Sequence, residues 1–254
     1  DLEDWEAGAH RCLLRLAQAA LPADRAAELD ALSELIQSST AEQVDPTART
    51  RFGAAYIGAL MLTGQAARGL DVVKQMGKRP SGPWCGPLEV LLTDLAPSDT
   101  CPLLHVDATA DDRGRALHLT IRVAQAILAS RTGDPEAAGS LLAEASAHWP
   151  ADLHPTPELW PALLVGARLS MQLCRTAPQA VCRDHLDRTS ALLARAAEAA
   201  PGVRQTFQWL RAELADARGQ AIRAWWWRKG LAPAVRNRAL IGVLGDSAAL
   251  DRVA

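Results

Sequence analysis

The sequence predicts an all-α fold, and three observations support this class. Alanine, leucine, arginine and glutamate, which favour helices, are abundant among the 254 residues. Tyr56 is the only tyrosine, and Phe52 and Phe207 are the only phenylalanines, whereas strands draw on aromatic and β-branched residues. Glycine and proline recur at short intervals, which predicts short helices that pack as antiparallel neighbours.

The first part of the chain, residues 1–78, reads as helix pairs. In the first helix Leu13, Leu14 and Leu16 contribute to an apolar face at helical spacing, and in the third helix the apolar run continues to a stop at Gly64. The pattern predicts helices over 3–20, 23–37, 47–62 and 66–76, which are separated or ended by Pro22, Pro46, Gly64 and Gly77.

Residues 79–112 interrupt this regularity. They contain five prolines and only one short apolar helix, near 88–95. A stretch of this length without a repeat is unusual inside a compact domain, so we expect an insertion or a junction between subdomains. The third predicted part, 113–254, returns to helix pairs and ends in capping helices. Its predicted helices are 113–131, 135–148, 157–174, 180–200, 203–218, 220–229, 232–243 and 246–252.

One stretch of the third part, 119–150, follows a repeat pattern. Small residues occur at Ala126, Ala138 and Ala145, the turn contains Gly133-Asp134, and Pro150 closes the unit. Small residues let helix axes approach closely, and proline ends a helix. This stretch resembles a tetratricopeptide repeat, whose unit is 34 residues of helix–turn–helix. Stretches around Gly64, before Pro201 and around Gly219 share part of the pattern, with departures at several positions.

The resemblance implies an α-α superhelix, a TPR-like solenoid of antiparallel helix pairs. In that family the first helix of each pair lines a concave groove that grips a peptide. Carried over residue by residue, the resemblance places these side chains in the groove: Arg51, Thr120, Val123, Ile127, Ser130, Trp209 and Glu213. The alternative is that several of them pack against neighbouring helices. Because the set lacks clustered lysines and asparagines, we expect a mixed or apolar peptide surface as its partner.

The five cysteines bear on the compartment. Cys174 and Cys182 flank a turn, and Cys85 and Cys101 lie beside prolines, so each pair is placed for a disulfide that would stabilise the fold by about 2 to 3 kcal/mol. Disulfides persist in oxidising compartments, which favours a periplasmic or extracellular protein. The alternative is that all the cysteines, Cys12 included, are reduced thiols in a cytoplasmic protein.

Three consecutive tryptophans, Trp225, Trp226 and Trp227, precede Arg228 and Lys229. Helical geometry spreads the three indoles around the helix, so one narrow buried stripe cannot hold them all. One interpretation is a helix covered on two sides, by its predecessor and by a terminal capping helix. The other is an exposed aromatic surface for a partner or a membrane interface.

Charge and motifs narrow the function classes. The net charge is -2 with no basic block, which gives a nucleic-acid partner no electrostatic support. No apolar run reaches the roughly 18 to 20 residues of an integral membrane segment. Asp111-Asp112 has no third carboxylate at helical spacing, and the histidines are scattered singly, so we expect no metal site, no cofactor and no catalytic residues.

We therefore expect a protein–protein interaction scaffold rather than an enzyme. It would bind a protein or peptide in the concave groove, as the interaction domain of a larger bacterial regulator or envelope complex. Two alternatives from other classes remain open: a helical accessory domain of a cell-wall lytic enzyme, and a sensory domain that binds a small ligand between helices. The sequence contains no signal for the oligomeric state.

Overall fold

The computed structural model describes residues 2–18, 22–38, 45–63, 65–77, 82–93, 112–147, 149, 155–176, 179–201, 204–229 and 231. Within these residues the chain forms α-helices and short 3-10 segments, with no strand, so the all-α prediction is confirmed. The predicted helices 232–243 and 246–252 lie outside the described residues.

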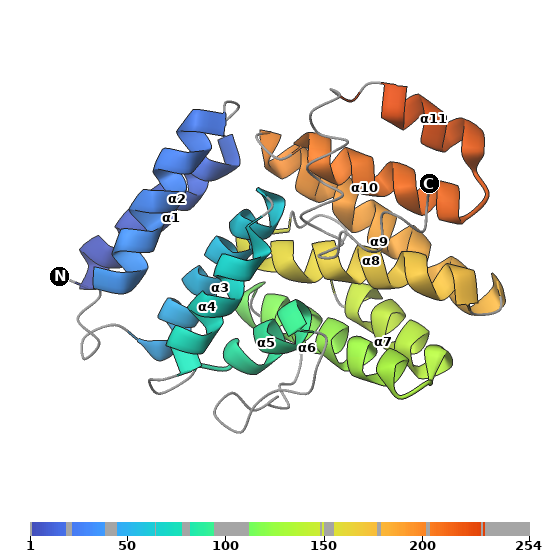
Figure 1. Ribbon diagram of the computed structural model, residues 1–254, viewed down its shortest axis with the longest axis horizontal. Coiled ribbons are helices and arrows are strands. Elements are labelled where there is room, and N and C mark those ends of the chain that lie inside the picture. The colour runs from blue at the N-terminus through green and yellow to red at the C-terminus, as the bar shows by residue number, and fades with distance from the viewer. Residues whose placement is uncertain are drawn as a thin grey trace.

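The helices of the N-terminal half form two hairpins and a short fifth helix. They are α1 (Leu2–Gln18), α2 (Pro22–Ser38), α3 (Pro46–Leu62), α4 (Ala66–Gly77) and α5 (Cys85–Thr93). Figure 1 shows α1 and α2 side by side at one end of the molecule, next to α3 and α4. Each predicted helix of residues 1–78 therefore exists, with ends that differ from the prediction by at most two residues.

Helix α3 lies at the centre of this half. Every side chain from Ala48 to Leu62 is buried, because α3 contacts α1, α2 and α4 and also the later elements η1 and α8. Asp45 starts the helix: its carboxylate accepts a hydrogen bond from the backbone N–H of Ala48 at 2.9 Å, and Pro46 occupies the first turn, where a missing N–H costs nothing.

The short helix α5 is part of the core. Its residues Cys85, Leu88, Val90 and Leu91 are buried, and α5 packs against α4, α6 and α8. The sequence predicts a helix near 88–95, but the observed helix begins earlier, at Cys85. Pro87 is compatible with this start because the first helical turn needs no backbone donor at that position.

Three further hairpins make up the C-terminal half. They are α6 (Asp112–Arg131) with α7 (Pro135–Ala147), α8 (Trp160–Thr176) with α9 (Gln179–Ala199), and α10 (Arg204–Ala217) with α11 (Ala221–Lys229); η1 (Pro157–Leu159) leads into α8. Gly133 and Gly219, at φ +83° and +73°, make the left-handed turns inside the first and third hairpins.

The first helices of the hairpins contact one another in order, α6 with α8 and α8 with α10, and α7 contacts α9. Helix α11 departs from this order. It packs on α10 but makes no comparable contact with α9, and Figure 1 shows it at the edge of the molecule beyond α10.

A second departure links the two halves. Helix α3 packs against η1 and α8, which belong to a hairpin that is not its neighbour in sequence. In a solenoid each repeat contacts only its neighbours. The contact of α3 with α8 does not fit that rule, because it joins the predicted parts 1–78 and 113–254 directly. Helix α5, from the predicted junction, packs against α4 of the first part and against α6 and α8 of the second.

The predicted disulfides are wrong. Cys12, Cys85 and Cys174, the cysteines whose side chains the structure describes, are present as thiols and form no disulfide, whereas the side chains of Cys101 and Cys182 lie outside the described residues. Cys85 is fully buried at the start of α5, where its thiol packs in the core. The periplasmic or extracellular location was expected only because of these disulfides, so the structure gives no support for it.

Candidate functional site

A small hollow opens between α6 and α8, the first helices of two successive hairpins. Its volume is about 260 Å³. Two of the predicted groove residues, Ile127 and Ser130, line it. The complete lining is Ile127, Ser130, Arg131, Arg168, Leu169 and Gln172, and we call this set the α6–α8 hollow.

The lining of the α6–α8 hollow combines an apolar floor with a basic rim. Ile127 and Leu169 are buried, Arg131 and Gln172 are exposed, and Arg168 is half-buried. The described residues that line the hollow include two guanidinium groups and no carboxylate, and guanidinium groups suit an acidic group. Sites for drug-sized ligands span about 300 to 1,000 Å³, so this volume suits one side chain or a chain end.

The turn after α6 fixes the position of the basic rim. Arg131 is the last residue of α6, and the backbone N–H of Gly133 closes the turn by donating to the carbonyl of Ser130 at 3.2 Å. Asp134 then caps α7 by accepting from the backbone N–H of Ala137 at 2.9 Å. These hydrogen bonds define the backbone of the turn that directly follows Arg131, whose side chain lines the hollow.

Three other predicted groove residues of the C-terminal half are buried. Thr120 is fully buried and donates its hydroxyl to the carbonyl of Ala116 at 2.8 Å. Val123 is buried next to Gly166 of α8, and Trp209 is 4% exposed. Neighbouring helices cover these three side chains, which therefore pack in the core and do not line an open groove.

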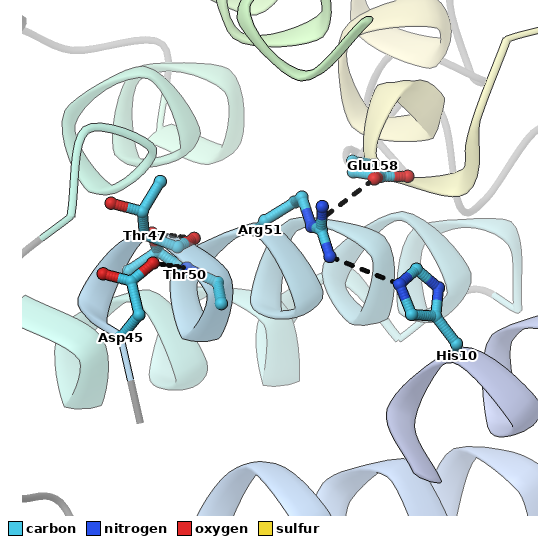
Figure 2. Close-up of polar contacts among 7 residues, drawn as sticks. His10, Asp45, Thr47, Thr50, Arg51 and Glu158 are labelled. Carbon is cyan, nitrogen blue, oxygen red and sulfur yellow. Dashed lines mark hydrogen bonds and ion pairs between the residues drawn. The ribbon is translucent and has the colours of Figure 1, made fainter. Parts of the chain in front are cut away.

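Arg51 is also buried and links three elements (Figure 2). From α3 its Nη2 lies 3.4 Å from Nε2 of His10 on α1, and its Nε lies 3.7 Å from Oε1 of Glu158 on η1. Its guanidinium also lies 4.7 Å from the centroid of the Phe52 ring. The role of Arg51 in this arrangement is to hold helices together, and it does not face an open groove.

Glu213 is half-buried and holds α11 against α10. Its carboxylate accepts a hydrogen bond from Nε of Arg228 at 3.0 Å, and Asp216 accepts one from Nη2 of Arg228 at the same distance. Burial lowers the pKa of Arg228, but the hydrogen bonds and charges of Asp216 and Glu213 outweigh it, so the pKa lies above its ordinary value. Both carboxylates are thus engaged within the hairpin.

Two of the three consecutive tryptophans are exposed. Trp225 is 54% and Trp226 62% exposed, their rings meet edge to face at 5.4 Å, and Nζ of Lys229 lies 5.0 Å from the Trp225 centroid. Trp227 is half-buried against Arg211. The expectation of an exposed aromatic surface therefore fits Trp225 and Trp226.

The sequence analysis missed Arg131, Arg168 and Gln172. A signal was available for two of them, because Arg168 and Gln172 are four residues apart on a helix whose other residues from 160 to 173 are almost all apolar. Polar residues at that spacing share one helix face, which must point away from the core.

Among the described residues, no helix has the length and hydropathy to cross a membrane, and no group of histidine, cysteine and acidic side chains is arranged to hold a metal. Comparison with family models, curated proteins and solved structures finds no match to this chain.

Proposed function

We propose that the chain is a protein-interaction scaffold whose stacked, TPR-like helix hairpins hold a segment of a partner protein at the α6–α8 hollow. The observation that carries the proposal is the hollow itself. It lies between the first helices of two successive hairpins, which is where the resemblance to tetratricopeptide repeats expects a peptide, and Ile127 and Ser130 line it.

The lining refines the chemistry of the partner. An apolar floor of Ile127 and Leu169 suits an aliphatic side chain, and Arg131 and Arg168 suit a carboxylate beside it. We therefore propose a partner segment in which an acidic side chain or a terminal carboxylate is adjacent to an aliphatic residue. The proposal assigns no catalytic step to the chain and does not depend on its compartment.

Selection from a random peptide library tests this function. Wild-type protein is expected to enrich peptides that pair an acidic with an aliphatic residue. The doubly charge-reversed variant Arg131→Glu/Arg168→Glu is expected to lose that enrichment. Because Arg168 is half-buried, the single variant Arg131→Glu at an exposed position serves as a second test that leaves the core intact.

The matched control reverses the same number of charges away from the hollow. Arg11 on α1 and Lys74 on α4 are both exposed, so Arg11→Glu/Lys74→Glu changes the net charge equally. We expect this control to enrich the same peptides as wild type. Enrichment that is lost equally in the control would show that net charge alone attracts the peptides, and the assignment to the hollow would fail.

A further inference from the structure

A larger cavity lies between α9, α10 and α11, on a different part of the molecule from the α6–α8 hollow. Its volume is about 440 Å³, within the range of small-molecule sites. We call it the basic cavity. It is lined by Asp187, Ser190, Ala191, Arg211, Leu214, Ala215, Arg218, Gln220, Arg223 and Trp227.

The cavity exists because α11 does not follow the packing of the preceding second helices. Helix α7 packs on α9, whereas α11 packs on α10 and makes no comparable contact with α9. The space that such a contact would fill stays open, and residues of all three helices face it. The cavity is thus a consequence of how the last described hairpin docks.

The lining carries an excess of positive charge. Three arginines and one aspartate line the cavity, and the aspartate, Asp187, already accepts a hydrogen bond from Arg218. Arg211 and Arg223 converge on one indole, with guanidinium carbons 4.5 Å and 5.9 Å from the centroid of Trp227. Two positive charges beside one ring favour an anion at this wall.

Arg211 has a buried side-chain donor, Nε, without a hydrogen-bond partner among the described residues. The pKa of Arg211 lies below its ordinary value, because burial and, to a smaller extent, the neighbouring Arg223 lower it more than Glu198 raises it. Arginine stays charged at neutral pH, so a partly desolvated cation lines the cavity.

We propose that the basic cavity binds a small molecule that joins a phosphate or carboxylate group to an apolar body. The oxyanion would accept hydrogen bonds from Arg211 and Arg223, and Ser190 and Gln220 offer further polar contacts. Ala191, Leu214 and Ala215 supply the apolar wall against which the rest of the ligand packs. Phosphate and carboxylate share this chemistry, and the choice between them is left to experiment.

The test follows Arg side-chain Nε–H resonances by NMR while phenyl phosphate or phenylacetate, each an oxyanion joined to an apolar ring, is added at constant ionic strength. We expect a saturable shift of the Arg211 resonance, and the anion that saturates at the lower concentration identifies the ligand class. Isothermal titration calorimetry supplies the dissociation constant. Sodium chloride at equal ionic strength serves as the blank for nonspecific screening.

Two variants locate the site. Arg211→Gln is expected to weaken binding about tenfold or more, because it removes a charge-assisted donor. Arg223→Gln, at an exposed position where the fold is not at stake, is expected to weaken binding severalfold. The control Arg204→Gln removes a charge from the same helix α10 outside the cavity and is expected to bind like wild type.

Shifts that rise linearly without saturation, or equal affinities for wild type and Arg223→Gln, would overturn the proposal. The peptide selection described for the α6–α8 hollow should be unaffected by Arg211→Gln. The two sites are therefore separable by experiment, and the failure of one leaves the other standing.

Discussion

Gly58 of α3 and Trp160 of α8 approach so closely that a Cβ atom on Gly58 would lie 2.7 Å from the Cβ atom of Trp160. The same atom would lie 2.8 Å from Cδ of Pro161 and 3.3 Å from its nitrogen. These neighbours are attached to the backbone and cannot rotate away. The absence of a side chain at position 58 therefore sets the distance between the two helices.

The substitution Gly58→Ala tests this relationship. The added methyl group forces α3 and α8 apart, and overpacking of this kind costs about 1 to 3 kcal/mol in the free energy of unfolding. Chemical denaturation measures the loss. The matched control is Gly166→Ala on α8, where the new Cβ would meet Val123 at an ordinary 3.6 Å. Because alanine favours helices over glycine, the control should gain up to about 1 kcal/mol.

Arg51→Met tests the link between α1, α3 and η1. The Arg51 and Glu158 side chains are 5% and 13% exposed, so removing the guanidinium leaves a carboxylate with little solvent, at a cost of about 3 kcal/mol. Arg122 and Glu144 form an ion pair at 2.7 Å in which the carboxylate is better solvated, because the Glu144 side chain is 40% exposed. Arg122→Met should therefore cost about 1 kcal/mol or less, as is typical of ion pairs whose carboxylate stays in contact with water. Equal losses in the two variants would contradict the buried position of Arg51.

Thiol alkylation without reductant tests the correction on disulfides. After denaturation, Cys12, Cys85 and Cys174 should all react with iodoacetamide, as mass spectrometry can show. In the native protein Cys12 should react slowly at pH 8. Burial raises the pKa of its thiol above the ordinary value, Glu28 raises it further, and the opposing arginines Arg15 and Arg11 do not outweigh them. A raised pKa leaves less of the reactive thiolate at that pH. Cysteines that stay unalkylated after denaturation, in a chain whose mass is two units below that of the reduced chain for each pair, would instead support the predicted disulfides.

Mutation of exposed and of buried tryptophans should change the free energy of unfolding by different amounts. Trp225→Gln and Trp226→Gln change exposed positions and should leave the free energy of unfolding within about 0.5 kcal/mol of wild type. Trp160 is 1% exposed, so Trp160→Ala should cost about 3 to 5 kcal/mol. Acrylamide quenching of the fluorescence should fall in the first two variants. A large loss of stability in either would mean that these indoles are covered in solution.

Local features of the fold could be predicted from the sequence. The helix boundaries follow from glycine, proline and capping residues, which act within a few positions of themselves; Gly133 and Asp134 predict their turn in this way. Helical geometry also predicts that three consecutive indoles cannot share one buried stripe, and the exposures of Trp225 and Trp226 agree.

Relationships between distant segments could not be predicted. Nothing near Gly58 indicates that Trp160 lies against it, because that contact depends on how whole hairpins dock. The pairing of Cys85 with Cys101 was inferred from adjacency in sequence, which does not determine distance in space. Of the candidate groove residues, Ile127 and Ser130 line the α6–α8 hollow, whereas Arg51, Thr120 and Trp209 are covered by helices whose packing the repeat pattern does not specify.

The contact of α3 with α8 also has a consequence for how the molecule comes apart. In a linear array of repeats, stability is a sum over adjacent units, and end units can be trimmed one at a time. Here α3 of the second hairpin packs against α8 of the fourth, so removing either hairpin takes support from a helix far away in the sequence. We expect the part of the chain from α3 to α9 to unfold in a single cooperative step, because its first and last hairpins support each other directly.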